Sequence, residues 1–356
     1  MDLPSIARSM RSRMPWSVGQ LVLHGNEVDR GRGWDRTVNH LSAANSPFQT
    51  KTNDLAASLK EHLLCGEKLT RFYYLEDAEI DILWDAIKDA QIEDTAFKQS
   101  YPLTLTEEEL SSQPLQMQLT AVEENEFGLA AIFSSVRTLT LRVELERDSM
   151  SDEVSEALSD FDEIYAVKHT KIHAADVLWI PSTGNYVDVR VDYPLGMLRQ
   201  TGEFAQGLIK DIANNLAGHS LLQAPENLFP IMSSMYNASN EGIVTELAFG
   251  TTSASLKHEK MRRNRSCLRQ EVYHVGGKAA LATDIEPYKL SIRYKRPVDE
   301  NRNSLPELNL HSSVRSANGR APTLTDAVIR RCAGLEDFEL VRSRVEHFLA
   351  LHRAAG

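Results

Sequence analysis

Cysteine is scarce in this sequence, and its positions exclude two common kinds of cross-linked site. The three cysteines, Cys65, Cys267 and Cys332, lie far apart and are odd in number. Because no C-x₂-C pair occurs, a thiolate zinc site is not expected. A disulfide framework is not expected either, which fits a reducing compartment. We therefore expect a cytoplasmic protein that carries no metal and no cofactor.

Long apolar runs are also absent. The N-terminal stretch "MDLPSIARSMRSRMPW" has basic residues but no apolar core of signal-peptide length. The longest weakly polar run, Gly128–Val136, is far too short to span a bilayer. These features predict a soluble protein that makes no contact with a membrane.

The common catalytic signatures are missing as well. The sequence contains no P-loop, no G-x-G-x-x-G, no H-E-x-x-H and no G-x-S-x-G. It also lacks an acidic strand followed by E-x-K, which speaks against the common restriction-type nuclease core. Function therefore has to be inferred from weaker patterns.

Charge of each sign is present but unevenly placed. Residues 104–164 hold 15 acidic and 3 basic side chains (−12), whereas residues 257–356 hold 19 basic and 12 acidic ones (+7). Such asymmetry indicates an anionic partner for the basic part. Two alternatives remain open: the two regions attract each other, or they serve solubility alone.

Hydrophobic periodicity predicts a mixed architecture. Helical spacing favours helices over 54–64, 77–91, 195–218, 226–238 and 335–352. Alternation favours strands over 68–75, 137–146, 162–172, 175–180, 185–193, 242–249, 270–275, 288–295 and 305–312. Short connections favour antiparallel pairing. We predict an α+β fold with mostly antiparallel sheets flanked by helices, and a C-terminal helix.

Composition divides the chain into three parts. Residues 1–50, rich in Arg, Gly, Asn and Ser, are predicted to form a loop-rich N-terminal arm. An N-terminal α+β domain is expected over 51–150 and a C-terminal α+β domain with a basic surface over 160–356. The boundary is placed in the polar, acidic stretch 148–159. Within 185–193, the alternating Asp188, Arg190 and Asp192 predict a self-paired, exposed sheet face.

The stretch "KHTKIHAAD" (Lys168–Asp176) offers the sharpest hint of chemistry. His169, Lys171 and Asp176 follow the spacing H-x-K-x₄-D. On a strand, His169 and Lys171 leave the same face. A histidine can attack phosphorus, a lysine can neutralise a phosphoryl oxygen, and an aspartate can orient the imidazole. The alternative is a polar, solvent-exposed strand whose three residues share this spacing by chance.

This spacing resembles the HKD motif of the phospholipase D and Nuc-type phosphodiesterase superfamily, over residues 164 to about 185. The resemblance implies a metal-independent phosphodiesterase in which two such motifs meet and one histidine forms a phosphohistidine. A second H-x-K occurs at His258 and Lys260, but Arg265 stands at its Asp position. The resemblance would then require homodimerisation to bring two complete motifs together.

A basic stretch near the C-terminal third is the other candidate site. "KHEKMRRNRSCLR" (Lys257–Arg269) is followed by a Gly-Gly pair and by the strand "YKLSIRYK". Clustered cations with interleaved aromatic residues suit phosphates or single-stranded nucleic acid. The residues expected to contact an anion are Lys257, Lys260, Arg262, Arg263, Arg265, Arg269, Lys278, Arg293 and Lys295. The alternative is a solvated basic surface.

Two functions follow from these patterns. The first is a cytoplasmic binding, adaptor or sensor-type subunit whose basic C-terminal third contacts an anionic partner, either nucleic acid or an acidic protein surface. Such a subunit fits a bacterial multi-protein system, with other protein subunits or further copies of the chain as partners. The second is the phosphodiesterase or nuclease built on His169, Lys171 and Asp176.

Overall fold

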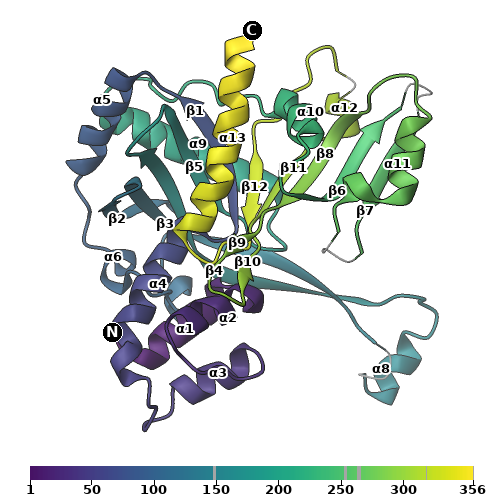
Figure 1. Cartoon of the computed structure of the whole chain (residues 1–356). Coiled ribbons are helices and arrows are strands. Elements are labelled where there is room, and N and C mark those ends of the chain that lie inside the picture. The colour runs from purple at the N-terminus through teal and green to yellow at the C-terminus, as the bar shows by residue number, and fades with distance from the viewer. Residues whose placement is uncertain (147–149, 252–254, 263–265, 318, 356) are drawn as a thin grey trace.

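The fold is built from one large sheet and the helices that cover it (Figure 1). The computed structural model describes residues 1–146, 150–251, 255–262, 266–317 and 319–355. Its helices are α1 (Leu3–Arg13), α2 (Trp16–Gly25), α3 (Trp34–Leu41), α4 (Thr52–Cys65), α5 (Asp77–Lys88), α6 (Ala96–Ser100), α7 (Glu107–Ser111), α8 (Asp152–Ala157), α9 (Arg199–Ala217), α10 (Phe229–Asn237), α11 (Val272–Ala279), α12 (Val314–Ala317) and α13 (Leu335–Ala355), with 3₁₀ turns η1 (Gln49–Lys51) and η3 (Leu268–Gln270).

The strands form a ten-stranded sheet in the order β2-β3-β4-β5-β1-β12-β11-β8-β6-β7. All neighbouring pairs in it are antiparallel. The strands are β1 (Lys68–Tyr74), β2 (Gln118–Asn125), β3 (Gly128–Glu144), β4 (Tyr165–Pro181), β5 (Tyr186–Asp192), β6 (Ile243–Gly250), β7 (Leu256–Lys260), β8 (Glu286–Arg293), β11 (Glu307–His311) and β12 (Ala327–Arg330), beside a small pair, β9 (Arg296–Pro297) and β10 (Asn303–Ser304). The predicted α+β class, antiparallel sheet and C-terminal helix are confirmed.

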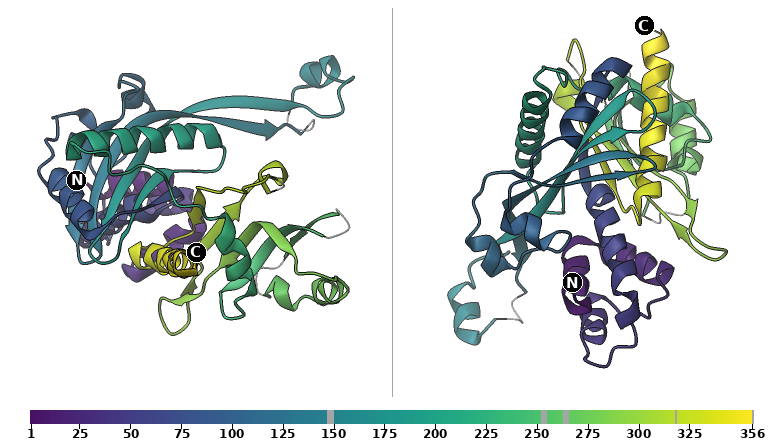
Figure 2. Two further views of the ribbon diagram at one scale, coloured as in Figure 1. Left: turned by 90° about the horizontal axis from the view of Figure 1, so that it is seen from above. Right: turned by 90° about the vertical axis from the view of Figure 1, so that its left-hand side faces the viewer.

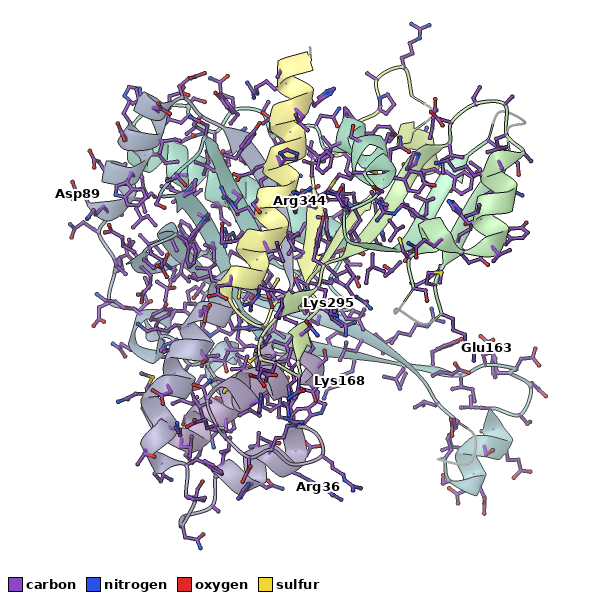
Figure 3. The ribbon with its side chains drawn as sticks, viewed as in Figure 1. Arg36, Asp89, Glu163, Lys168, Lys295 and Arg344 are labelled. Atoms are coloured by element: carbon purple, nitrogen blue, oxygen red, sulfur yellow. The ribbon has the colours of Figure 1, made fainter. Side chains whose placement is uncertain are left out.

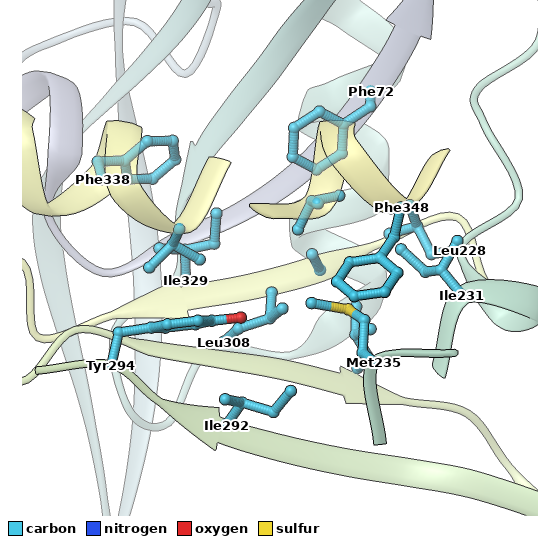
Figure 4. Close-up of a cluster of buried hydrophobic side chains, with 14 of the residues drawn as sticks. Phe72, Leu228, Ile231, Met235, Ile292, Tyr294, Leu308, Ile329, Phe338 and Phe348 are labelled. Carbon is cyan, nitrogen blue, oxygen red and sulfur yellow. The ribbon is translucent and has the colours of Figure 1, made fainter. Parts of the chain in front are cut away.

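Helices α4, α10 and α13 cover one face of the sheet across both of its halves, whereas α5 and α9 cover the other face over the half formed by β1 to β5, and alternation along the strands explains how (Figure 2). In β1, Tyr73 faces the core under α5 and α9, whereas Phe72 faces the core under α4, α10 and α13. The core under α4, α10 and α13 is shown in Figure 4, where Phe338 and Phe348 of α13 lie over strand residues such as Ile329. Among the described residues, no helix is long and apolar enough to cross a membrane.

Residues 1–50 differ from the loop-rich arm predicted for them. They form α1, α2 and α3, which share a core with Leu55 and Leu59 of α4, and Leu3, Ile6 and Met10 are fully buried in it. The Asp2 side chain accepts a hydrogen bond from the Ser5 N–H and caps α1. In the stretch expected to be irregular, the Trp34 indole donates to the Met14 carbonyl. Alternating arginines and serines on the outer surface hid this apolar pattern.

Two other segments also differ from their predicted structure. Residues 270–275, predicted as a strand, contain the start of α11, because the Glu271 side chain caps that helix by accepting from the His274 N–H. The strands predicted over 162–172 and 175–180 are the single strand β4, which pairs with β3 from Gly128↔Pro181 to Glu144↔Tyr165. The described part of the stretch 148–159, residues 150–159, therefore lies in the connection between two paired strands. Residues 148 and 149 are outside the described residues.

The face of β5 that was predicted to be exposed is buried under α13. Asp188 and Arg190 have no exposed surface, and Asp192 is 9% exposed. The Asp188 carboxylate accepts from Arg190 Nε (2.5 Å) and from Arg342 Nε of α13 (2.7 Å). Burial raises the pKa of the neighbouring Glu346 to about 7. Asp188 and Arg190 therefore belong to a buried ion cluster that ties the sheet to α13, whereas Asp192, at the end of β5, pairs with Arg13 and Lys68.

Replacing Asp188 by alanine is expected to lower the free energy of unfolding by about 3–5 kcal/mol, because two buried guanidinium groups then lose the carboxylate they share. Urea denaturation measures this change. Lys88→Ala is the control, since it removes an exposed ion pair to Glu124 (2.9 Å) and should leave the free energy of unfolding nearly unchanged. Equal losses in the two variants would contradict a central role for the cluster.

Candidate functional site at the base of the β3–β4 arm

Strands β3 and β4 continue past their neighbours and form a projecting ribbon, here called the arm. It comprises residues 135–144 of β3, residues 165–174 of β4 and the described part of their connection, including α8 (Figures 1 and 2). On one side, β2 pairs with β3 only as far as Ser134. On the other side, β5 pairs with β4 only from Val177 to Trp179. Within the described ranges, the arm's strands pair only with each other.

Two carboxylates occupy the place where β4 and β5 diverge. Asp192 Oδ2 accepts a hydrogen bond from the Ala175 N–H (2.7 Å), and Asp176 Oδ1 accepts one from the Asp192 N–H (2.9 Å). Each carboxylate thus binds a backbone donor that lacks a strand partner. An unpaired backbone N–H in this buried position would be costly.

Three cations complete this cluster. Lys68 Nζ donates to Asp192 Oδ1 (2.6 Å) and to the Ala175 carbonyl (2.7 Å). Arg13 donates to Asp192 Oδ2 (2.6 Å) and to the His173 carbonyl (2.7 Å). Arg137 pairs with Asp176. Arg13 therefore ties α1 to β4 at His173, just beyond the residues of β4 that pair with β5.

The charge states follow from this arrangement. Burial opposes ionisation of Asp192, yet Arg13 and Lys68 hold the pKa of its carboxyl below the usual range. Burial lowers the pKa of Lys68, while Asp192 counteracts that effect. Arg13, Lys68 and Arg137 carry one more charge than Asp176 and Asp192 together, so the base of the arm is cationic.

A cavity of about 620 Å³ opens beside this cluster. One face of α1, with serines and arginines at helical spacing, lines it from one side, and residues 170–173 of β4 line it from the other. Nδ1 of His62, a side chain that is 3% exposed in total, has no hydrogen-bond partner among the described residues. Burial lowers the pKa of His62 to about 4. The cavity therefore presents a neutral imidazole together with side chains of both charges, since Glu67, Glu107 and Glu109 line it as well as Arg8, Arg13 and Lys171.

His173 is held as a neutral tautomer at the edge of the cavity. Its Nδ1 accepts from the Leu105 N–H (3.2 Å), so Nε2 carries the proton and donates to Ser134 Oγ (3.0 Å). Although part of its surface lines the cavity, burial lowers the pKa of His173 to about 3, with Arg13 adding to the effect. Because both nitrogens are engaged, His173 is not free to bind a metal.

The three residues of the His-Lys-Asp pattern are not brought together. His169 is exposed on the arm, where its Nδ1 lies 3.2 Å from Thr140 Oγ1. Lys171 lines the cavity. Asp176 lies seven residues from His169 in the same continuous strand, about 23 Å away at the usual rise per residue. Asp176 binds Arg137, so it does not orient His169 as the resemblance required.

The degenerate second copy is also engaged in other contacts. His258 and Lys260 of β7 both bind Glu246, at 2.8 Å and 3.0 Å. Arg265, at its Asp position, lies outside the described residues. His169 and His258 thus have separate partners, Thr140 and Glu246.

The predicted anion-binding residues do not form one surface. Arg293 is buried and pairs with Glu307, and Arg269 donates to the backbone carbonyls of the turn after α10. Lys278 lies over the Tyr236 ring, 4.7 Å from its centroid. Lys257, Arg262 and Lys295 are exposed (Lys295 is labelled in Figure 3), and Arg263 lies outside the described residues.

A second cavity, of about 770 Å³, lies beside α10 and α11. The Tyr236 hydroxyl lies 2.7 Å from His274 Nε2, and His274 Nδ1 lies 2.6 Å from the Glu259 carboxylate. All three groups are thereby paired, and Tyr236 and His274 are buried. This chain of hydrogen bonds ties α11 to β7.

Sequence reasoning missed Arg13, Lys68, Arg137 and Asp192 as members of a site. Among residues 1–146, 150–251, 255–262, 266–317 and 319–355, no three His, Cys, Asp or Glu side chains are placed to hold a metal ion.

Comparison with protein-family models, with curated proteins and with solved structures finds no match for this chain.

The two buried histidines predict a loss of stability in acid. Their folded pKa values, about 4 for His62 and about 3 for His173, lie below the unfolded value of 6.5. The folded state therefore binds fewer protons than the unfolded state, and stability falls as the pH drops below about 6.5.

His173→Asn tests this expectation, because an amide oxygen can still accept from the Leu105 N–H. The fall in unfolding free energy between pH 7 and pH 5 should be about 2 kcal/mol smaller in this variant than in the parent chain. Urea denaturation at the two pH values provides the comparison. An unchanged fall would show that His173 is protonated in the folded protein.

Proposed function

We propose that this chain is a cytoplasmic protein-interaction subunit that engages a partner protein through the β3–β4 arm. The observation that carries the proposal is the extension of β3 and β4 beyond β2 and β5, which leaves both edges of a paired ribbon without a neighbouring strand among the described residues. Strand edges of this kind are the natural templates for pairing with another chain.

The arm exposes apolar side chains that a partner would bury. Val143 is 53% exposed, Val167 is 57% exposed and Phe161, near the tip, is 58% exposed. An isolated two-stranded ribbon is only marginally stable in water. Removing these side chains from water would stabilise both the arm and the complex, since burial of apolar surface is favourable.

The charge of the arm favours a protein over a nucleic acid as its partner. Residues 135–174, which make up the arm and its connection, carry nine acidic and five basic side chains, a balance of −4, and eight of the acidic ones lie between residues 146 and 163. This charge repels phosphate groups and favours a basic protein surface. An anionic partner at the basic residues is a separate proposal that now rests on Lys257, Arg262 and Lys295. No contact favours the phosphodiesterase alternative.

Site-specific photo-cross-linking in cells tests the arm. A photoreactive phenylalanine analogue at Val143 is expected to form an adduct with a protein, because Val143 is exposed on the arm. The same analogue at Ile82 of α5, which is 41% exposed, is the control for random collisions. Equal adducts at both positions, no adduct at Val143, or an adduct with nucleic acid would overturn the proposal.

A further inference from the structure

We propose that the arm's partner is a second copy of this chain, and that the two copies pair antiparallel along the free edges of their β4 strands. This inference rests on the proposed interaction function and names the partner. It predicts a symmetric dimer in which the same edge of both copies forms the interface.

The backbone of β4 is prepared for such pairing. The Ala175 N–H and carbonyl and the His173 carbonyl point away from β3, because they bind Asp192, Lys68 and Arg13. By strand alternation, the N–H and C=O groups of Lys171, His169 and Val167 point the same way. Across the described ranges these groups have no hydrogen-bond partner. Side chains of the body thus complete the edge near the base, while farther along the arm the edge is open.

The register between β3 and β4 leaves this edge straight. All seventeen pairs, from Gly128↔Pro181 to Glu144↔Tyr165, are in continuous register without a bulge. Bulges and prolines are common protections of free edges, and β4 has no proline before Pro181. Figure 1 and the left panel of Figure 2 show the outer part of the arm projecting away from the rest of the chain, so a second arm can approach it there.

Charge is distributed along the arm in a way that favours antiparallel pairing. Asp160, Asp162 and Glu163 lie toward the tip, whereas Lys168 and Lys171 lie closer to the cationic base (Figure 3 labels Glu163 and Lys168). Antiparallel pairing about a two-fold axis brings the tip of each arm beside the base of the other. Parallel pairing would place like charges together, which costs free energy.

One register matches both hydrogen bonding and charge. With the two-fold axis at Val167, the outward-facing backbone N–H and C=O groups of Val167 in one copy bond to those of Val167 in the other. Lys171 of each copy then stands opposite Glu163 of the other, which lies two residues before the start of β4 and accepts a hydrogen bond from the Tyr165 hydroxyl. The acidic tip of each arm comes to lie next to the cavity at the base of the other arm.

The first test compares proline with alanine at His169 in the full-length chain, by sedimentation over a wide range of concentration. The parent chain is expected to dimerise. His169→Pro removes one outward N–H from each copy without touching the bonds to β3, so it should weaken dimerisation about tenfold or more. His169→Ala keeps the N–H and should stay close to the parent.

Val167→Pro and Val167→Ala repeat the comparison at the axis, and far-UV circular dichroism checks that each variant is folded. A parent chain that remains monomeric at every concentration would overturn the inference. So would proline variants that fold and dimerise as well as their alanine counterparts. If Val143 then formed an adduct with a different protein, the proposed interaction function would be supported, but the proposal that the partner is a second copy of this chain would be wrong.

Charge exchange tests the register independently. Lys171→Glu and Glu163→Lys should each weaken the dimer, because each places like charges opposite one another. The double variant restores opposite charges and should recover most of the affinity, and the coupling between the two changes measures the pairing. Additive losses in the double variant would contradict the axis at Val167.

Discussion

The structure depends on how the backbone of β4 is satisfied after β5 turns away from it. A strand that loses its neighbour inside a protein leaves donors and acceptors that water does not reach. Here Asp192 and Asp176 accept from backbone N–H groups, while Lys68 and Arg13 donate to the carbonyls of Ala175 and His173. Side chains thus replace a missing strand for a few residues, and the arm begins where they end.

This replacement explains why charged residues occur in such a protected place. Burying an ion pair is costly, and removing one partner leaves the other charge uncompensated. The charges persist because each also binds a backbone group. Arg13 comes from α1, so the N-terminal helices are part of this arrangement and not an appendage to the sheet. The result is a tightly bonded base from which a ribbon with an acidic tip projects.

The local pattern of the sequence predicted much of the fold but little of the site. β1, α5 and α13 were predicted within a few residues of their observed bounds, because their apolar residues follow one clear period. Asp188 and Arg190 were misinterpreted, because alternation states which residues share a face but not whether a distant helix covers it. The partners of Asp192 are Lys68 and Arg13, which are far away from it in sequence. Such contacts depend on the order of strands, which periodicity does not reveal.

The central claim is that the β4 edge is free from Lys171 toward the tip in the isolated chain. Residue-resolved amide hydrogen exchange, measured at high dilution, tests it most directly. Thr170 and Ile172 face β3 and should be protected, whereas His169 and Lys171 face outward and should exchange rapidly. Equal protection of all four amides in the dilute chain would show that something already covers this edge, and would contradict the account.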